Sequence, residues 1–334
     1  MSAQPPVSAD GQAGASAEER PGRIEAVPVR HPGRWVAVAV IAVLVAMFLH
    51  LLLTNPVFNW PFVFEAMNQR VVIEGFIYGT LLVTLGAMVV GVVGGVILAV
   101  MRLSPNPVLS GVSWVFTWFF RGIPRLVLLT FTGGIGALFA TGLSIGVPFD
   151  FLLDRWFGTG ELRLFTLSQT EINVLVGSIF GGIIGLGLSE AAYMAEIARA
   201  GILSVDRGQQ EAAEALGMTR SQTMRRIVLP QAMRVIVPPT GNEVTAMLKD
   251  TSLLIGIPVT AELFFQLRNI GSTTYQLIPV FVAAILYYLA ATSVLMVGQY
   301  FLEKRFGRGF GSRMAPKPKA AAGAGAGAAT GGAK

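Results

Sequence analysis

Five charged residues stand inside or beside long apolar stretches and are the first candidates for chemistry: Arg121, Arg125, Glu190, Lys249 and Asp250. A charge at the centre of a bilayer costs roughly 2.5–3.5 kcal/mol on insertion scales, so such residues usually face a cavity or pair with one another. Two interpretations stay open. Either these side chains line or gate a path for a polar substrate, or they form ion pairs between helices. Lys249 and Asp250 do not face each other on a helix, so each needs another partner.

Covalent and metal chemistry have few candidates in this chain. Cysteine is absent and His31 and His50 are the two histidines, which leaves no thiolate ligand and too few imidazoles for a metal centre. No glycine is followed by lysine, so the Gly-x-x-x-x-Gly-Lys-[Ser/Thr] loop that cradles nucleotide phosphates is missing. We expect no catalytic residue, no metal and no cofactor bound by this chain.

The polar segment 196–243 is a long insert between two apolar stretches, and its first half carries helix signals. Asp206 is a good N-cap, and Gln209 follows three residues later, a spacing like that of a capping box. The helix is expected to run through Leu216 and to stop at Gly217, because glycine commonly follows a helix end.

The second half of this insert predicts another helix. Thr219 and Gln222 have the capping-box pattern at its start. Pro230, and then Pro238-Pro239, are expected to break the helical pattern. The insert therefore predicts a helix–turn–helix that forms a docking surface on the cytoplasmic face.

The elements that must position these residues are membrane helices. The chain of 334 residues is 53% hydrophobic and only 13% charged, whereas soluble domains carry roughly 25% charged residues. A soluble enzyme is excluded on these grounds. Six apolar stretches are long enough to span a bilayer, which predicts an all-α integral membrane protein. They are residues 35–53, 76–101, 112–140, 172–192, 244–265 and 277–302.

The two ends of the chain differ from this apolar body. Residues 1–34 are rich in Ala, Pro, Gly and charge, and residues 307–334 are of low complexity, so both are expected to be disordered. The stretch 35–53 is expected to be an uncleaved anchor, because the residues after it offer no small-residue cleavage site. Within the spans, Gly91 with Gly95 and Gly181 with Gly185 have a spacing that lets helices approach closely.

Basic residues predict the orientation. With the N-terminus inside, six spans leave four basic residues outside (Arg70, Arg155, Arg163 and Arg268) and 19 inside, with Arg121 and Arg125 uncounted. This asymmetry follows the positive-inside rule, so both termini are expected to be cytoplasmic. The formal net charge of +6 thus indicates membrane topology, and we expect no nucleic-acid partner.

The insert has a specific family resemblance. It closely resembles the EAA signature of the membrane subunits of bacterial ATP-binding-cassette (ABC) importers, in residue type and in spacing. In that family this loop is the coupling helix that fits a groove on the ATPase subunit. The residues that carry the match are Glu211, Ala212, Ala213, Gly217, Ile227, Leu229 and Pro230.

Three further elements narrow the resemblance to polar amino-acid permeases of the histidine/glutamine type. Residues 121–124 (Arg-Gly-Ile-Pro) are similar to that family's Arg-Gly-Thr-Pro, with Ile for Thr. Residues 192–196 (Ala-Tyr-Met-Ala-Glu), followed by Arg199, resemble its Ala-Tyr-x-Ala-Glu element, and residues 248–253 resemble its Lys-Asp-Thr-Ser-Leu stretch. The match covers about 70–306 and implies a five-helix type I permease core, to which 35–53 adds an extra helix.

The resemblance implies a permease subunit that carries polar amino acids into the cytoplasm without hydrolysing ATP itself. The implied partners are ABC ATPase subunits that bind ATP and Mg, a second permease chain, an extracytoplasmic amino-acid-binding protein and the lipid of the inner membrane. The alternatives are an ion-coupled secondary amino-acid transporter, which needs no ATPase, and a membrane signalling or scaffold protein, which carries no flux. The amino acid carried stays open, since Glu190 suits a cationic substrate and Arg121 or Arg125 an acidic one.

Overall fold

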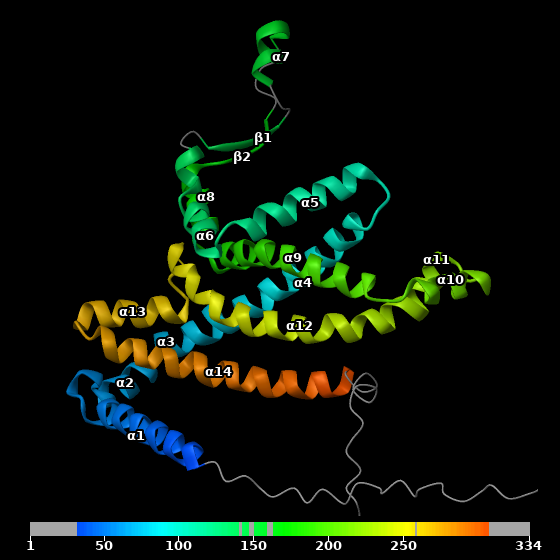
Figure 1. Ribbon diagram of the computed structural model, residues 1–334. Coiled ribbons are helices and arrows are strands. Elements are labelled where there is room, and N and C mark those ends of the chain that lie inside the picture. Colours follow the sequence, from blue (N-terminus) through cyan, green and yellow to red (C-terminus); the bar gives the residue numbers. More distant parts are fainter. Residues whose placement is uncertain (1–31, 140–141, 147–149, 159–162, 258, 307–334) are drawn as a thin grey trace, which may run out of the picture. The chain divides into compact units, whose positions relative to one another are not determined.

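The computed structural model describes residues 32–139, 142–146, 150–158, 163–257 and 259–306. The expected terminal arm, apart from its last three residues, and the expected tail lie outside the described residues. The chain divides into two units, which join between Asn55 and Pro56 and are described separately (Figure 1).

The described part of the first unit consists of the helix α1 (Pro32–Thr54). Its side chains are exposed almost without exception and are apolar around the whole circumference, as expected of a helix surrounded by lipid. The helix is long and apolar enough to cross a membrane, which agrees with the span predicted at 35–53.

Among its described residues, the second unit consists of helices, one hairpin and connecting turns. Its elements are η1 (Pro56–Phe58), α2 (Trp60–Met67), α3 (Arg70–Glu74), the π-helical η2 (Gly75–Leu81), α4 (Leu82–Arg102), α5 (Pro107–Gly122), α6 (Arg125–Gly133), η3 (Ile135–Phe139), β1 (Leu143–Gly146), α7 (Asp150–Phe157), β2 (Arg163–Leu167), α8 (Gln169–Val176), α9 (Ile179–Leu203), α10 (Arg207–Ala215), α11 (Arg220–Thr223), the π-helical η4 (Met224–Val228), α12 (Leu229–Asp250), η5 (Thr251–Gly256), α13 (Leu263–Thr274) and α14 (Leu277–Phe306).

Five of the six predicted spans correspond to membrane-length apolar elements of the described chain. Three are single helices: α1, the stretch Arg70–Arg102, and α14. Two are bent pairs, in which α5 meets the helical stretch from α6 to η3 at 96° and α8 meets α9 at 70°.

The sixth prediction, a span at 244–265, is corrected by the structure. That segment is divided between the end of α12, the 3-10 turn η5 and the start of α13. Gly256 and Pro258 interrupt its helical sequence pattern, and Glu262 begins a new helix as the N-cap of α13.

A hairpin, which the sequence reasoning did not predict, lies between α6 and α8. Strands β1 and β2 pair antiparallel, with Leu143 opposite Leu167, and α7 lies between them in the chain. Leu143 and Leu167 are the first and last residues of the two strands. The hairpin and α7 lie between the third and fourth predicted spans.

Helices α4 and α9 have the most extensive contact of any helix pair in the described chain, and glycines on α4 permit their close approach. A Cβ atom added to Gly91 would lie 2.5 Å from Cγ of Glu190, and one added to Gly95 would collide with Met194. The predicted close approach at Gly91 and Gly95 is confirmed. Gly181 instead abuts the carbonyl of Val176 in the α8–α9 bend.

Replacing Gly91 with valine is expected to destabilise this pair. Overpacking a close contact typically costs about 1–3 kcal/mol, so the apparent melting temperature of the detergent-purified protein should fall. Gly298→Val is the matched control, because a Cβ at Gly298 on α14 meets no atom within 4 Å. Equal melting temperatures for the two variants would contradict the role given to Gly91.

Candidate functional site

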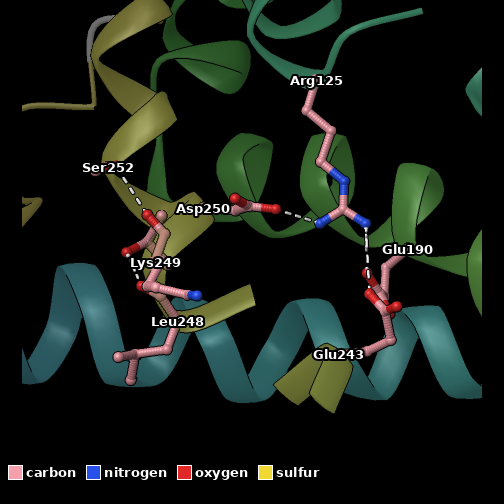
Figure 2. Close-up of polar contacts among 8 residues, drawn as sticks. Arg125, Glu190, Glu243, Leu248, Lys249, Asp250 and Ser252 are labelled. Atoms are coloured by element: carbon pink, nitrogen blue, oxygen red, sulfur yellow. Dashed lines mark hydrogen bonds and ion pairs between the residues drawn. The ribbon is translucent and has the colours of Figure 1, made fainter. Parts of the chain in front are cut away.

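One arginine gathers three carboxylates at the centre of the second unit (Figure 2). The Arg125 guanidinium donates from Nη2 to Oε2 of Glu190 at 2.8 Å. Its Nη1 donates to Oδ2 of Asp250. Oε2 of Glu243 lies 3.9 Å from Nη2. These residues come from α6, α9 and α12, so the cluster joins three helices that are far apart in the sequence.

The cluster is shielded on one side and open on another. The Glu190 side chain is fully buried and that of Arg125 is 11% exposed, whereas those of Glu243 and Asp250 are 25% and 29% exposed. With all groups ionised, three carboxylates and one guanidinium leave a net charge of −2. A low-dielectric site with that excess attracts cations.

The Tyr193 ring contacts Arg125 and also a second arginine, Arg121. Its centroid lies 4.6 Å from the Arg125 guanidinium carbon and 5.5 Å from that of Arg121. Both distances are within the range of a cation–π contact. The ring thus stabilises two guanidinium groups that would otherwise repel each other.

Irregular backbone positions these side chains. Arg125 is the first residue of α6, directly after Pro124 at the 96° bend. Asp250 is the last residue of α12, where the chain continues into η5. Non-helical backbone at membrane depth is tolerated where it is buried in protein or lines a cavity, and both breaks meet at this cluster.

The cluster has unused hydrogen-bonding capacity. Among the described residues, Oε1 of Glu190 and Oγ of the neighbouring Ser189 are buried and have no hydrogen-bond partner. An unsatisfied buried carboxylate oxygen is costly. Oε1 of Glu190 therefore remains an unused acceptor next to Arg125.

Of the five charged residues singled out from the sequence, the structure brings Arg125, Glu190 and Asp250 together. Arg121 instead contacts the Tyr193 ring, with its guanidinium carbon 5.5 Å from the ring centroid. Lys249 does not join them: its exposed side chain lines an apolar groove of about 540 Å³ with residues of α13 and α14, and it points away from Asp250 in Figure 2.

Sequence reasoning missed Glu243 and Tyr193, although a signal existed for both. Glu243 precedes Asp250 by seven residues, and Tyr193 follows Glu190 by three. Such spacings place residues on one face of a helix. Both are polar residues at positions that share a helix face with a candidate charge.

Glu262 is a second buried carboxylate, but both of its oxygens already accept hydrogen bonds. It accepts hydrogen bonds from the hydroxyls of Thr80 (3.0 Å) and Tyr288 (2.8 Å), and from the backbone N–H groups of Phe264 and Phe265. Glu262 thus links η2, α13 and α14, and we assign it a structural role.

The predicted N-caps Asp206 and Thr219 are confirmed, but Gln209 does not complete a capping box with Asp206. Oδ1 of Asp206 accepts from the N–H of Gly208 at 2.8 Å. Gly217 has φ +76°, and the N–H of Met218 returns to the carbonyl of Ala213 at 3.0 Å, as in a Schellman ending. The reciprocal capping box of Thr219 and Gln222 is present at the start of α11.

The predicted breaks at the prolines are wrong. The chain remains helical from Arg220 through η4 to Asp250. Pro230 comes two residues after the end of the π-helical turn η4, and such local π adjustments accommodate the missing N–H of a proline within a membrane helix. Pro238 and Pro239 lie inside α12, which is tolerated in a packed membrane helix.

The residues of the EAA resemblance divide between surface and core. Glu211, Ala212, Gly217, Leu229 and Pro230 are exposed, Ile227 is half-buried and Ala213 is buried. Leu216, the chain neighbour of Gly217, is an apolar side chain that is 83% exposed. Its exposure at the end of α10 makes it a further candidate contact.

The comparisons with known proteins point in one direction. Residues 91–308 match the family described as the binding-protein-dependent transport system inner membrane component. The chain is 44% identical over 300 residues to the arginine transport system permease protein ArgU of Corynebacterium glutamicum, covering 90% of this chain and 87% of that protein. It is 32% identical over 243 residues to the probable glutamine ABC transporter permease protein GlnM of Bacillus subtilis, covering 73% and 96%.

A solved structure agrees with these relatives. The crystal structure of an amino acid ABC transporter with histidines matches with a TM-score of 0.51 and 31% identity, covering 70% of this chain and 94% of the matched chain.

Proposed function

We propose, from the premise that this chain belongs to the family of inner membrane components of binding-protein-dependent transport systems, that it is the permease subunit of an ABC importer for polar amino acids. The single observation that carries this is the 44% identity to an arginine permease over nine-tenths of the chain. The chain is a transport component of the inner membrane and not an ATPase.

We assign the partners by the same reasoning. Two ABC ATPase subunits, which bind ATP and Mg, supply the energy, a second permease chain completes the path, and an extracytoplasmic binding protein delivers the substrate. Residues 70–306 form the transport domain and 196–243 the coupling loop, with both termini in the cytoplasm. The charge asymmetry of the loops supports this orientation.

One continuous helical stretch connects the coupling loop to the charge cluster. The exposed surface of Glu211, Ala212, Leu216 and Gly217 is the proposed contact with the ATPase. From Arg220 the chain runs without a helical break to Asp250. A displacement of the loop therefore reaches the carboxylates that hold Arg125, and two distinct sites become coupled.

The cluster supports a cationic amino acid as the substrate. Its excess of carboxylates over guanidinium groups, the unpartnered oxygen of Glu190 and the Tyr193 ring together suit a guanidinium or ammonium group. We therefore place Arg125, Glu190, Glu243 and Asp250 on the path. Arg121 lies beside them and suits the carboxylate of the same substrate.

The test is uptake by proteoliposomes that contain this chain, its ATPase and its binding protein. Labelled arginine is expected to enter only with ATP, and to exceed labelled glutamate by at least about tenfold. Uptake driven by a proton or sodium gradient without ATPase would instead support the ion-coupled transporter. Absence of flux with all partners present would favour a signalling or scaffold role.

A further inference from the structure

A second polar cleft lies beside the charge cluster, and Tyr193 contributes to both. It has a volume of about 570 Å³ and is formed by α4, α5 and α9. Its lining contains three arginines against one carboxylate. The lining residues are Arg102, Trp114, Thr117, Trp118, Arg121, Gly122, Tyr193, Glu196 and Arg199.

The single carboxylate of this cleft is already occupied. Oε2 of Glu196 accepts from Nε and Nη2 of Arg199, at 3.0 and 2.8 Å. Arg102 donates to the carbonyl of Ser110 at 3.3 Å. Among the described residues, Arg121 contacts the Tyr193 ring and forms no ion pair. The cleft thus has a net charge of +2 and several free N–H donors.

The location of the cleft suggests which anion it meets. Arg102 is the last residue of α4, and Arg199 lies four residues before the end of α9, near the start of the coupling loop. Trp114 and Trp118 are stacked with ring centroids 6.2 Å apart, and both are exposed. Arginine at the end of a membrane helix with exposed tryptophan nearby is typical of headgroup depth.

We propose that this cleft binds the phosphate of an anionic phospholipid of the cytoplasmic leaflet. Guanidinium groups bind phosphate oxygens in a bidentate manner, and basic pockets between membrane helices take lipid headgroups. The stacked tryptophans contact the glycerol and upper acyl chains. The inference rests on the proposed orientation, which places the coupling loop in the cytoplasm.

The test measures lipid retained by the purified permease–ATPase complex. The complex is equilibrated with mixed micelles of phosphatidylglycerol or phosphatidylcholine, and the bound lipid is counted by native mass spectrometry. Phosphatidylglycerol is expected to exceed phosphatidylcholine. Arg102→Gln/Arg199→Gln should lower its affinity at least about tenfold, whereas Arg305→Gln, the same change at the end of α14 outside the cleft, should not.

A gain-of-binding variant separates the site from misfolding. Glu196→Gln removes the competing carboxylate and should raise phosphatidylglycerol affinity, which a damaged fold does not explain. Equal retention of both lipids, or unchanged affinity in the double variant, would overturn the proposal. Competition by inorganic phosphate at equal concentration would also overturn it, in favour of a small-anion site. If ATP-driven uptake is intact, any of these three results overturns the lipid site without contradicting the proposed transport function.

Discussion

Replacing Gly217 with valine is expected to reduce ATP-driven uptake to background while the protein still inserts into the membrane. Gly217 holds φ +76°, a region that costs a β-branched residue about 1–3 kcal/mol. No atom lies within 4 Å of a Cβ built there, so the strain is confined to the turn between α10 and α11. The turn must then rearrange, and the surface proposed to meet the ATPase loses its shape. Uptake and ATPase co-purification are the measurements.

Two controls make this test specific. Asparagine tolerates the left-handed region, so Gly217→Asn should retain most of the uptake. Gly298→Val adds the same side chain in open space on α14 and should behave as wild type. Normal uptake by Gly217→Val would remove the coupling assignment from this loop.

Replacing Arg125 with methionine is expected to abolish uptake and to lower the melting temperature. The change leaves the fully buried Glu190 without its cation, and breaking a buried pair on one side costs about 3–5 kcal/mol. Uptake in proteoliposomes and the apparent melting temperature of the detergent-purified complex are measured in parallel.

The double variant Arg125→Met/Glu190→Gln separates a substrate path from an ion pair that only holds helices together. Neutralising Glu190 removes the unpaired charge, so stability should recover in part under either interpretation. Uptake should stay at background if the cluster is the path. A double variant that regains uptake would show that the cluster is structural.

Signals that depend on neighbouring residues were predictable from the sequence. The caps at Asp206 and Thr219 and the helix end at Gly217 follow from backbone groups within three or four positions, and the structure has all three. The single-helix spans follow from apolar length alone. These predictions agree with the structure because the interactions that determine them are between residues close together in the sequence.

Features that depend on distant partners were not predictable in this way. Whether Asp250 or Lys249 faces Arg125 depends on the rotation of α12 and on the 96° bend before α6. Proline was expected to end a helix, but the π-helical η4 and packing carry the helix past Pro230 and Pro238. The β1–β2 hairpin is likewise set by pairing across an intervening helix.

The close contact of Glu190 with the glycine backbone of α4 has a consequence for engineering the transporter. Glu190 has no space to become larger, because Gly91 already lies against its Cγ. Glu243 and Asp250 are partly exposed and can change size without moving a helix. Directed evolution toward new substrates should therefore accumulate substitutions on α12, while the α9 side of the site stays as it is.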